Sequence, residues 1–275
     1  MTDFDYRRPA SLAEASELLH RDDAMALAGG TDLLVAIRHR RAKPALLVDL
    51  KSVSEIGVGI ETIDGRMRIG GRVVMSQLIA DERVRELFPS LAAAASVVGS
   101  IQIRNRATLA GNLCNASPAA DTAPPLLAHS AVVAVSGPDD DRSIALDEFF
   151  VGPGATVLQA GEVVTAVEIP IPATTTGSAF RRVTRRRGVD LASVNLACVV
   201  EESGRVTFGF GAVAPTPVVA ATTLDALEDD EGWFRLLSVT SPISDVRAGA
   251  EYRRAMLEVH ARRALQEAVE GRGER

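Results

Sequence analysis

Cysteine is scarce in this sequence, and its scarcity excludes several kinds of site. The 275 residues contain two cysteines, Cys114 and Cys198, which lie far apart and in no CxxC pattern. Two thiolates cannot supply the four ligands of an iron–sulfur cluster or of an all-cysteine zinc site. A disulfide framework is equally unexpected. The four histidines show no metal-binding spacing such as HExxH, so we expect no metal ion on this chain.

Catalytic motifs, long apolar runs and an excess of positive charge are also missing. There is no GxSxG elbow, and Cys114 has no adjacent basic residue, so we expect no catalytic side chain. No stretch approaches the ~20 apolar residues needed to span a bilayer, and the first residues, MTDFDYRRPA, lack the apolar core of a signal peptide. A formal net charge of -6 argues against a nucleic-acid-binding protein. We therefore expect a cytoplasmic protein without a membrane span.

The hydrophobic residues, 47% of the chain, are sufficient for a substantial core, and their periodicity predicts a mixed α/β arrangement over the first part. Asp64-Gly65 between two alternating segments predicts a hairpin with a primed turn. The segment 99–125 shows little periodicity and predicts a long loop, which in a compact domain is usually functional. Helices are predicted to begin at Ser11 and Thr31 and to cover 76–87 and 91–98, and strands to cover 24–28, 46–50, 132–136 and 163–169.

The last hundred residues predict a smaller α+β domain. The Pro- and Thr-rich stretch 169–177 is the best linker candidate. Beyond it, strands over 197–201 and 205–210 flank Glu202-Ser203-Gly204 and predict a hairpin. A long amphipathic helix is predicted over 248–270.

The first candidate site is AGGTDLL, residues 28–34. Glycine lets the backbone approach a ligand closely, and free N–H groups at the start of the following helix suit an anionic pyrophosphate. The motif is neither the GxGxxG of a Rossmann fold nor a Walker loop. A tight strand-to-helix turn with Thr31 as the N-cap explains these residues equally well at this point.

Two further segments are candidates. RNRATLAGNLCNASPAAD, residues 104–121, offers backbone donors, the amides of Asn112 and Asn115, and one carboxylate, Asp121. These groups suit phosphates and a ribose or heterocycle, although an irregular connecting loop would also contain them. FRRVTRRRGVDLA, residues 180–192, holds five arginines within 181–187. As a strand it would place Arg182 and Arg186 on one face and Arg181, Arg185 and Arg187 on the other. This segment predicts a solvated basic surface, a docking patch for an acidic partner, or one anion contact.

With these motifs the sequence resembles the FAD-binding, or medium, subunits of the xanthine dehydrogenase and aerobic carbon monoxide dehydrogenase family of molybdenum hydroxylases. AGGTDLL resembles the first pyrophosphate loop, and QIRNRATLAGNLCNASPAAD, residues 102–121, resembles the second flavin loop. The similarity continues through FRRVTRRRGVDLA, through GAVAPTP at 211–217 and through PISDVRAGAEYRRAML at 242–257. It therefore covers nearly the whole chain with several motifs in the same order.

The resemblance implies the fold and the organisation of the chain. The expected fold class is α+β. A vanillyl-alcohol-oxidase (PCMH)-type FAD-binding domain would occupy 1–172, with two α/β subdomains at about 1–55 and 56–172. A domain similar to the carbon monoxide dehydrogenase flavoprotein C-terminal domain, with an antiparallel sheet and helices, would occupy 177–275.

The resemblance also implies FAD as the cofactor and identifies the residues that bind it. The first loop would contact the pyrophosphate, Asp121 would hydrogen-bond the adenosine ribose, and Arg182 stands where relatives often have a lysine near the flavin ring. Ala110 stands where a glycine is common, and its methyl group could press on the cofactor. The implied FAD-binding residues are Ala28, Gly29, Gly30, Thr31, Asp32, Leu33, Leu34, Thr108, Gly111, Asn112, Leu113, Ala116, Ser117, Asp121 and Arg182.

In this family the chemistry is divided among chains. The resemblance implies a large molybdopterin subunit that oxidises the substrate, a small subunit with 2Fe–2S clusters that relays electrons, and a flavin subunit that passes them to NAD⁺, a quinone or oxygen. The expected assembly is a dimer of heterotrimers. The alternatives are a free-standing FAD-dependent oxidase or dehydrogenase and a flavin-free scaffold or assembly protein of the same fold. An arginine-rich nucleic-acid binder is rejected on overall acidity.

Overall fold

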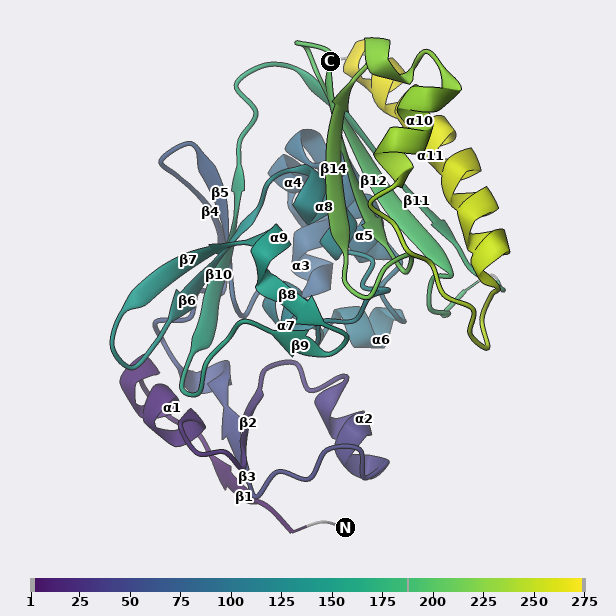
Figure 1. Ribbon diagram of the computed structural model, residues 1–275. Helices are drawn as coiled ribbons and strands as arrows, with labels where there is room; N and C mark the ends of the chain where they lie inside the picture. The colour runs from purple at the N-terminus through teal and green to yellow at the C-terminus, as the bar shows by residue number, and fades with distance from the viewer. Residues whose placement is uncertain (1–2, 187, 274–275) are drawn as a thin grey trace.

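The computed structural model describes residues 3–186 and 188–273, which form three main sheets in succession along the chain (Figure 1). The first sheet has three strands, the second five and the third four. Helices cover each of them, and the last sheet is antiparallel, so the predicted α+β fold class is confirmed. Within the described part of the chain, no helix is both long enough and apolar enough to cross a membrane.

The N-terminal sheet is parallel and small. Its elements are β1 (Asp5–Arg7), α1 (Leu12–Leu19), β2 (Ala24–Leu27), α2 (Leu33–Arg38), β3 (Leu46–Asp49) and the 3-10 turn η1 (Leu50–Ser52). The strand order is β1-β3-β2, and the central strand β3 is buried along its whole length. Helix α1 begins where predicted, because Ser11 accepts a hydrogen bond from the amide of Glu14 at 3.2 Å. Ala15 of α1 packs on Leu46 and Val48, which closes this part of the core.

The middle sheet is antiparallel, with helices packed against one face and at its edge. Its strands are β4 (Ile60–Ile63), β5 (Arg66–Gly70), β6 (Val132–Ser136), β7 (Asp141–Ala145) and β10 (Val163–Pro170), in the order β4-β5-β10-β6-β7. The predicted hairpin turn is confirmed, since Asp64 and Gly65 have φ values of 48° and 72°. The other elements are α3 (Met75–Ala80), α4 (Glu82–Leu87), α5 (Pro89–Ser96), α6 (Ile101–Arg104), α7 (Leu109–Cys114), α8 (Ala123–Ala128), α9 (Leu146–Phe149), β8 (Phe150–Gly152) and β9 (Ala155–Thr156).

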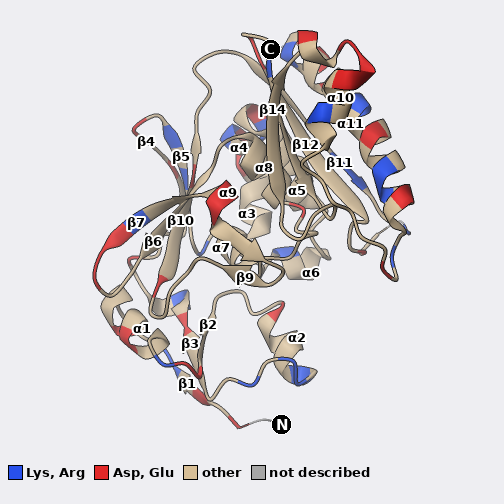
Figure 2. Cartoon of the chain, viewed as in Figure 1, with Lys and Arg blue, Asp and Glu red and all other residues tan. Residues whose placement is uncertain are grey.

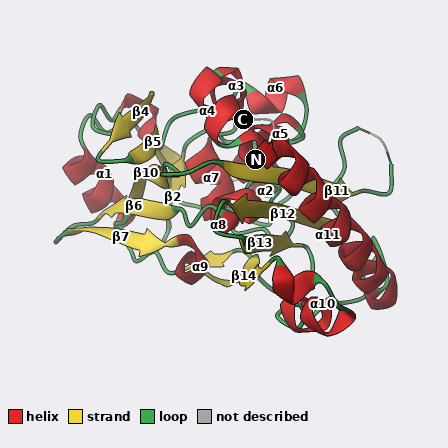
Figure 3. Cartoon of the chain, turned by 90° about the horizontal axis from the view of Figure 1, so that it is seen from above, coloured by secondary structure: helices red, strands yellow, loops and turns green. Residues whose placement is uncertain are grey.

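The C-terminal sheet lies between helices of its own and helices of the preceding part (Figures 1 and 3). Its elements are β11 (Thr176–Val183), β12 (Val194–Glu201), β13 (Arg205–Gly211), β14 (Val218–Thr223), η2 (Asp225–Leu227), α10 (Asp230–Leu237) and α11 (Ala250–Gly273). Helix α11 crosses β11 and β12 on one face, whereas α5 and α8 contact the sheet on the other. Strand β12 is consequently buried on both faces. Its Leu196 and Cys198 pack toward α11, and the alternating Ala197 and Val199 pack toward α8.

Two predictions about the extent of helices are wrong. The predicted helix 76–87 is two helices, because Asp81 is extended and its carboxylate caps the second one by accepting hydrogen bonds from the amides of Arg83 and Val84. The predicted loop 99–125 contains the helices α6, α7 and the start of α8. Helices of four to six residues are too short to produce the periodicity by which longer helices are recognised.

Candidate functional site

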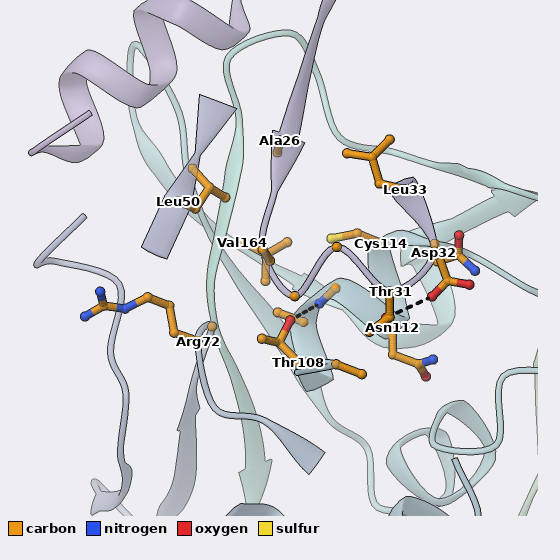
Figure 4. Close-up of a pocket in the computed structure, with 18 of the residues that line it drawn as sticks. Ala26, Thr31, Asp32, Leu33, Leu50, Arg72, Thr108, Asn112, Cys114 and Val164 are labelled. Carbon is orange, nitrogen blue, oxygen red and sulfur yellow. Dashed lines mark hydrogen bonds between the residues drawn. The ribbon is translucent and has the colours of Figure 1, made fainter. Parts of the chain in front are cut away.

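A cavity of about 380 Å³ lies where the N-terminal sheet meets α6, α7 and the strand β10 (Figure 4). One wall is the loop from Ala28 to Leu33, and the opposite wall is the segment from Asn105 to Asn115. Val163 and Val164 of β10 form an apolar floor. The two segments that the sequence singled out, some 75 residues apart, therefore meet at one cavity.

The first loop is shaped by its two glycines. Gly30 has a φ of 75°, a conformation that glycine adopts at little cost. Gly29 lies so close to the second segment that a Cβ there would sit 2.1 Å from the carbonyl oxygen of Arg106. The contact between the two loops therefore explains glycine at position 29. Within the described residues, the amide N–H groups of Gly29, Gly30 and Thr31 donate no hydrogen bond, which leaves them available to a ligand.

The second segment is held by its own helix cap and by the neighbouring helix. The hydroxyl of Thr108 caps α7 by accepting a hydrogen bond from the amide of Gly111 at 3.0 Å. The hydroxyl of Thr122 donates to Asn112 Oδ1 at 2.7 Å. Asn112 lines the cavity, and its Nδ2 group donates no hydrogen bond within the described residues. Met75 of α3 donates its amide to the carbonyl of Ala107 at 2.9 Å. These hydrogen bonds within the chain hold the second segment in place.

Not every predicted FAD-binding residue reaches the cavity. Those that line it are Ala28, Gly29, Gly30, Thr31, Asp32, Leu33, Thr108, Gly111 and Asn112. Those that do not are Leu34, Leu113, Ala116, Ser117, Asp121 and Arg182. Leu113 points into the core, and Ser117 accepts a hydrogen bond from the amide of Ala119. Ala110, which stands where a glycine is common, is buried and lines the cavity wall.

Asp121 and Arg182 form a buried ion pair that joins the second segment to the C-terminal sheet. Arg182 Nη1 lies 2.9 Å from Asp121 Oδ2 and donates also to the carbonyl of Val97 at 3.1 Å. Its Nη2 donates to the carbonyl of Asp190 at 2.7 Å. The fully buried Asn195 donates to the other carboxylate oxygen of Asp121 at 2.8 Å. Burial raises the pKa of Asp121 to about 6, although Arg182 and Asn195 act in the opposite direction.

The other described arginines of the segment 180–192 are paired within the chain. Strand β11 ends at Val183, so the predicted alternation of five arginines along one strand is wrong beyond that point. Arg181 forms a two-pronged ion pair with Glu267, and Arg185 and Arg186 lie 3.6 and 3.9 Å from the carboxylate of Asp190. Arg187 lies outside the described residues. The predicted basic surface is thus largely neutralised by acidic neighbours.

Sequence analysis missed two basic residues of the cavity, Lys51 and Arg72, and gave no role to a third, Arg106, within the second candidate segment. Lys51 Nζ lies 2.6 Å from the carboxylate of Asp49 and 3.4 Å from the carbonyl of Ala28, while Tyr6 donates its hydroxyl to the same carboxylate. Burial would raise the pKa of Asp49, but these hydrogen bonds hold it below its ordinary value. The sequence did contain a signal for Lys51. Because parallel strands end at the same edge of a sheet, the residues that follow β3 lie beside the glycine loop that follows β2.

Cys114 also lines the cavity. Burial raises the pKa of its thiol to about 12, so the thiol stays protonated at neutral pH and is a poor nucleophile. The cavity therefore offers backbone donors, an amide, cations and an apolar floor. Such a lining suits the binding of a large anionic cofactor.

Comparison with known proteins agrees with this geometry. Residues 2–172 match the FAD binding domain in molybdopterin dehydrogenase, and residues 178–268 match the CO dehydrogenase flavoprotein C-terminal domain. The xanthine dehydrogenase FAD-binding subunit of Escherichia coli is 31% identical over 99% of both chains. The carbon monoxide dehydrogenase medium chain of Afipia carboxidovorans is 33% identical over 96% of both chains.

Solved structures show the same relationship. A chain of carbon monoxide dehydrogenase from Hydrogenophaga pseudoflava superimposes with a TM-score of 0.89, at 31% identity and over 97% of both chains. A chain of quinoline 2-oxidoreductase from Pseudomonas putida gives a TM-score of 0.88 at 29% identity over 98% of both chains. The fold, the paired glycine loops and the family matches agree, and the chain belongs to the family of FAD-binding medium subunits of molybdenum hydroxylases, the flavoprotein oxidoreductase family of xanthine and carbon monoxide dehydrogenases.

Proposed function

We propose that this chain holds FAD in the cavity between the two glycine-containing loops and transfers electrons through it. The observation that supports the proposal is the meeting of residues 28–33 and 105–115 at a single cavity. FAD supplies the redox chemistry when bound, and the chain supplies its binding and orientation. No side chain of this chain is assigned a bond-breaking role.

The residues that line the cavity fall into groups suited to different parts of FAD. The free amides of Gly29, Gly30 and Thr31 are suited to the pyrophosphate, and Lys51 adds positive charge beside them. Asn112 is placed to donate to the ribityl chain or the ring from the opposite wall. Leu33 and the β10 valines exclude water from the apolar part of the cofactor.

The predicted residues outside the cavity lining have supporting roles in this proposal. Asp121 and Arg182 tie the end of the second loop to the C-terminal sheet, which fixes the loop without requiring their direct contact with FAD. Leu34, Leu113, Ala116 and Ser117 would act through packing and turn geometry.

The partners follow from the family. We place this chain between a small 2Fe–2S subunit, which delivers electrons, and an external acceptor such as NAD⁺, a quinone or oxygen, with a large molybdopterin subunit performing the substrate oxidation. A dimer of heterotrimers is the proposed assembly. The relatives' names support separate subunits, since several are called medium chains or medium subunits. The two free cysteines of this chain support a location in a reducing compartment, the cytoplasm. The residues matched by the two family models support a domain boundary between 172 and 177.

An absorption spectrum of the purified chain, with the released chromophore identified by mass, tests the proposal. Flavin bands and the mass of FAD are expected. A colourless chain that also fails to bind added FAD would contradict it and would favour a flavin-free scaffold. Purification from the native host adds a second test, because a free-standing oxidase would bring no molybdenum protein with it.

A further inference from the structure

Lysine is rare in this chain, and one of its lysines is held in place beside the cavity. The 30 basic residues include only two lysines, Lys43 and Lys51. Basic residues colour the segment after α2 blue in Figure 2, and Lys43 lies among them, exposed. Lys51 lines the cavity instead. A lysine side chain that is free in solvent loses rotamer freedom when it binds an anion, whereas a lysine that is already fixed binds without most of that loss.

Contacts within the chain hold both the backbone and the side chain of Lys51. Its Nζ lies 2.6 Å from Asp49 Oδ1 and donates to the carbonyl of Ala28 at 3.4 Å. Its amide donates to the same carboxylate oxygen at 3.0 Å. Its carbonyl accepts a hydrogen bond from Arg72 Nη1 at 2.5 Å, and Arg72 Nε donates to the carbonyl of Ile56 at 2.7 Å. The position of the ammonium group is therefore set by the protein itself.

Asp49 is the residue through which the ammonium of Lys51 is held. The side chain of Asp49 is only 2% exposed, and a buried carboxylate needs hydrogen bonds in place of its hydration. Tyr6 of β1 donates its hydroxyl to Asp49 Oδ2, while Lys51 occupies Oδ1. The parallel strand order β1-β3-β2 brings this carboxylate to the edge of the sheet at which the first glycine loop begins. Tyr6 and Lys51 therefore share one carboxylate beside that loop.

The carboxylate of Asp49 has two opposite effects on an anion in the cavity. It neutralises part of the Lys51 charge, which weakens the attraction, and it keeps the ammonium beside the loop, which strengthens the attraction. The contact with Ala28 decides between these effects, because Ala28 directly precedes the free amides of residues 29–31. A cation fixed at that place adds to the attraction of the amides for a phosphate. Without Asp49 the long side chain of Lys51 would be free to extend into solvent.

We propose that Asp49 and Tyr6 are positioning residues, which hold Lys51 beside the first glycine loop as a fixed cation for the pyrophosphate of FAD. The inference rests on the proposed function, because it assigns to the FAD site two residues that act through Lys51. The pyrophosphate is the anionic part of FAD. Changes at Lys51 and at its positioning residues should therefore alter the binding of any ligand that contains the pyrophosphate, whether or not it contains a flavin ring.

The test measures the binding of FAD and of ADP to the apoprotein by calorimetry at low and high salt. ADP contains the pyrophosphate and lacks the flavin. Lys51→Met removes the charge and keeps most of the side-chain length, and the matched control is Lys43→Met, at the exposed lysine outside the cavity. Asp49→Asn keeps the size of the side chain and removes its charge. Tyr6→Phe removes only the hydroxyl that bonds Asp49.

We expect Lys51→Met to weaken the binding of both FAD and ADP by about 10-fold at low salt and to reduce the salt dependence of the binding. Lys43→Met should bind both ligands as the wild type does. Asp49→Asn should weaken both by ~3-fold or more, because a neutral amide oxygen holds an ammonium less firmly than a carboxylate does. Tyr6→Phe should act in the same direction with a smaller effect. If Asp49 acted only by neutralising Lys51, Asp49→Asn would bind both ligands more tightly, and that result would overturn the positioning role.

A double-mutant cycle separates positioning from a general structural role of Asp49. If Asp49 acts through Lys51, Asp49→Asn should have almost no further effect on ligand binding once Lys51→Met is present. If Asp49 only supports the fold of the sheet, the effects of the two changes on binding should add. Additive effects would overturn the positioning role, and Tyr6→Phe in the same Lys51→Met background repeats the test with a milder change at a partly exposed residue.

The remaining outcomes distinguish this inference from the proposed function. Equal FAD affinity of Lys51→Met and Lys43→Met would overturn the inference and leave the flavin site intact. Weaker binding of FAD with unchanged binding of ADP would assign Lys51 to the flavin half of the cofactor and would also overturn it. Failure of the wild-type chain to bind FAD would instead overturn the proposed function, and the inference with it.

Discussion

Gly29 shows how a single residue can shape the site through the side chain that it lacks. Its missing Cβ lets the first loop lie against the carbonyl of Arg106 on the opposite wall. Sequence reasoning attributes such a glycine to close approach of a cofactor, whereas the structure shows close approach of another backbone segment. At this scale the shape of the cavity depends on the missing side chain of Gly29 as well as on the groups that line the cavity.

Gly29→Ala should therefore widen or distort the cavity. The added methyl group would lie 2.1 Å from the Arg106 oxygen, so the loops must separate, at a cost of about 1–3 kcal/mol for overpacking. We expect FAD affinity to fall by ~10-fold or more, measured by titration of the apoprotein. Gly271→Ala is the control, because no atom lies within 4 Å of the added group. Unchanged affinity in Gly29→Ala would show that the two loops do not hold the cofactor together.

Arg182→Lys should destabilise the protein although it keeps the charge. The guanidinium bonds Asp121, the carbonyl of Val97 and the carbonyl of Asp190 at once, and one ammonium group cannot reach all three in the same geometry. We expect a loss of about 1–3 kcal/mol in the free energy of unfolding. Arg181→Lys changes the half-exposed pair with Glu267, and it should lower the free energy of unfolding by less than about 1 kcal/mol. Denaturant unfolding of both variants checks the contrast, and equal effects would count against a special role for Arg182.

At the scale of elements, the C-terminal sheet is held between two helical layers. Its long helix, α11, contributes Ala261, Ala264 and Ala268, all fully buried, so the helix backbone approaches the sheet closely. The other face receives α8, every residue of which is buried. The short helix α8 thereby connects the cavity-bearing part to the C-terminal sheet.

Ala264→Leu should disturb this packing. The position is fully buried, and added methyl groups in a filled interface cost about 1–3 kcal/mol. Ala255→Leu, on the exposed face of the same helix, should change stability by less than about 0.5 kcal/mol. Thermal unfolding of the two variants measures the difference. If Ala264→Leu were as stable as its control, α11 would not be packed as closely as the structure indicates.

At the scale of the whole molecule, the buried pair of Asp121 and Arg182 joins two parts of the chain that sequence patterns treat separately. Asp121 belongs to the second loop, while Arg182 and Asn195 belong to the C-terminal sheet. The amide of Ala212 also donates to the carbonyl of Pro118 at 2.6 Å. The C-terminal sheet thus helps to set the shape of a loop that ends at the cavity.

The pH dependence of stability should report on this junction. Burial raises the pKa of Asp121 to about 6 in the folded protein, above its ordinary value of about 3.9. A raised pKa means that this carboxyl contributes stability below pH ~4 and that the contribution is lost as the pH rises through ~6. The free energy of unfolding of the wild type should thus fall relative to Asp121→Asn by up to about 3 kcal/mol over this range. Urea unfolding at several pH values measures the difference, and a constant difference would mean that Arg182 keeps Asp121 ionised throughout.

The sequence by itself determined much of the architecture. Local signals were sufficient for the hairpin at Asp64-Gly65, the cap at Ser11 and the long last helix, because turns, caps and periodic faces depend on neighbouring residues. The order of the motifs was sufficient to identify the family. The glycine loop and the second segment were both identified as candidates for the site.

Only the tertiary structure decided how these pieces combine. The helices α6, α7 and α8 left no periodic signal because each is a few residues long and is stabilised by contacts with distant parts of the chain. Lys51, Arg72 and Arg106 became cavity residues through the packing of separate segments, and Asp121 and Arg182 became an ion pair across 61 residues of sequence. Burial, ion pairing and cavity shape depend on which distant residues meet, and such contacts leave no pattern in the order of neighbouring residues.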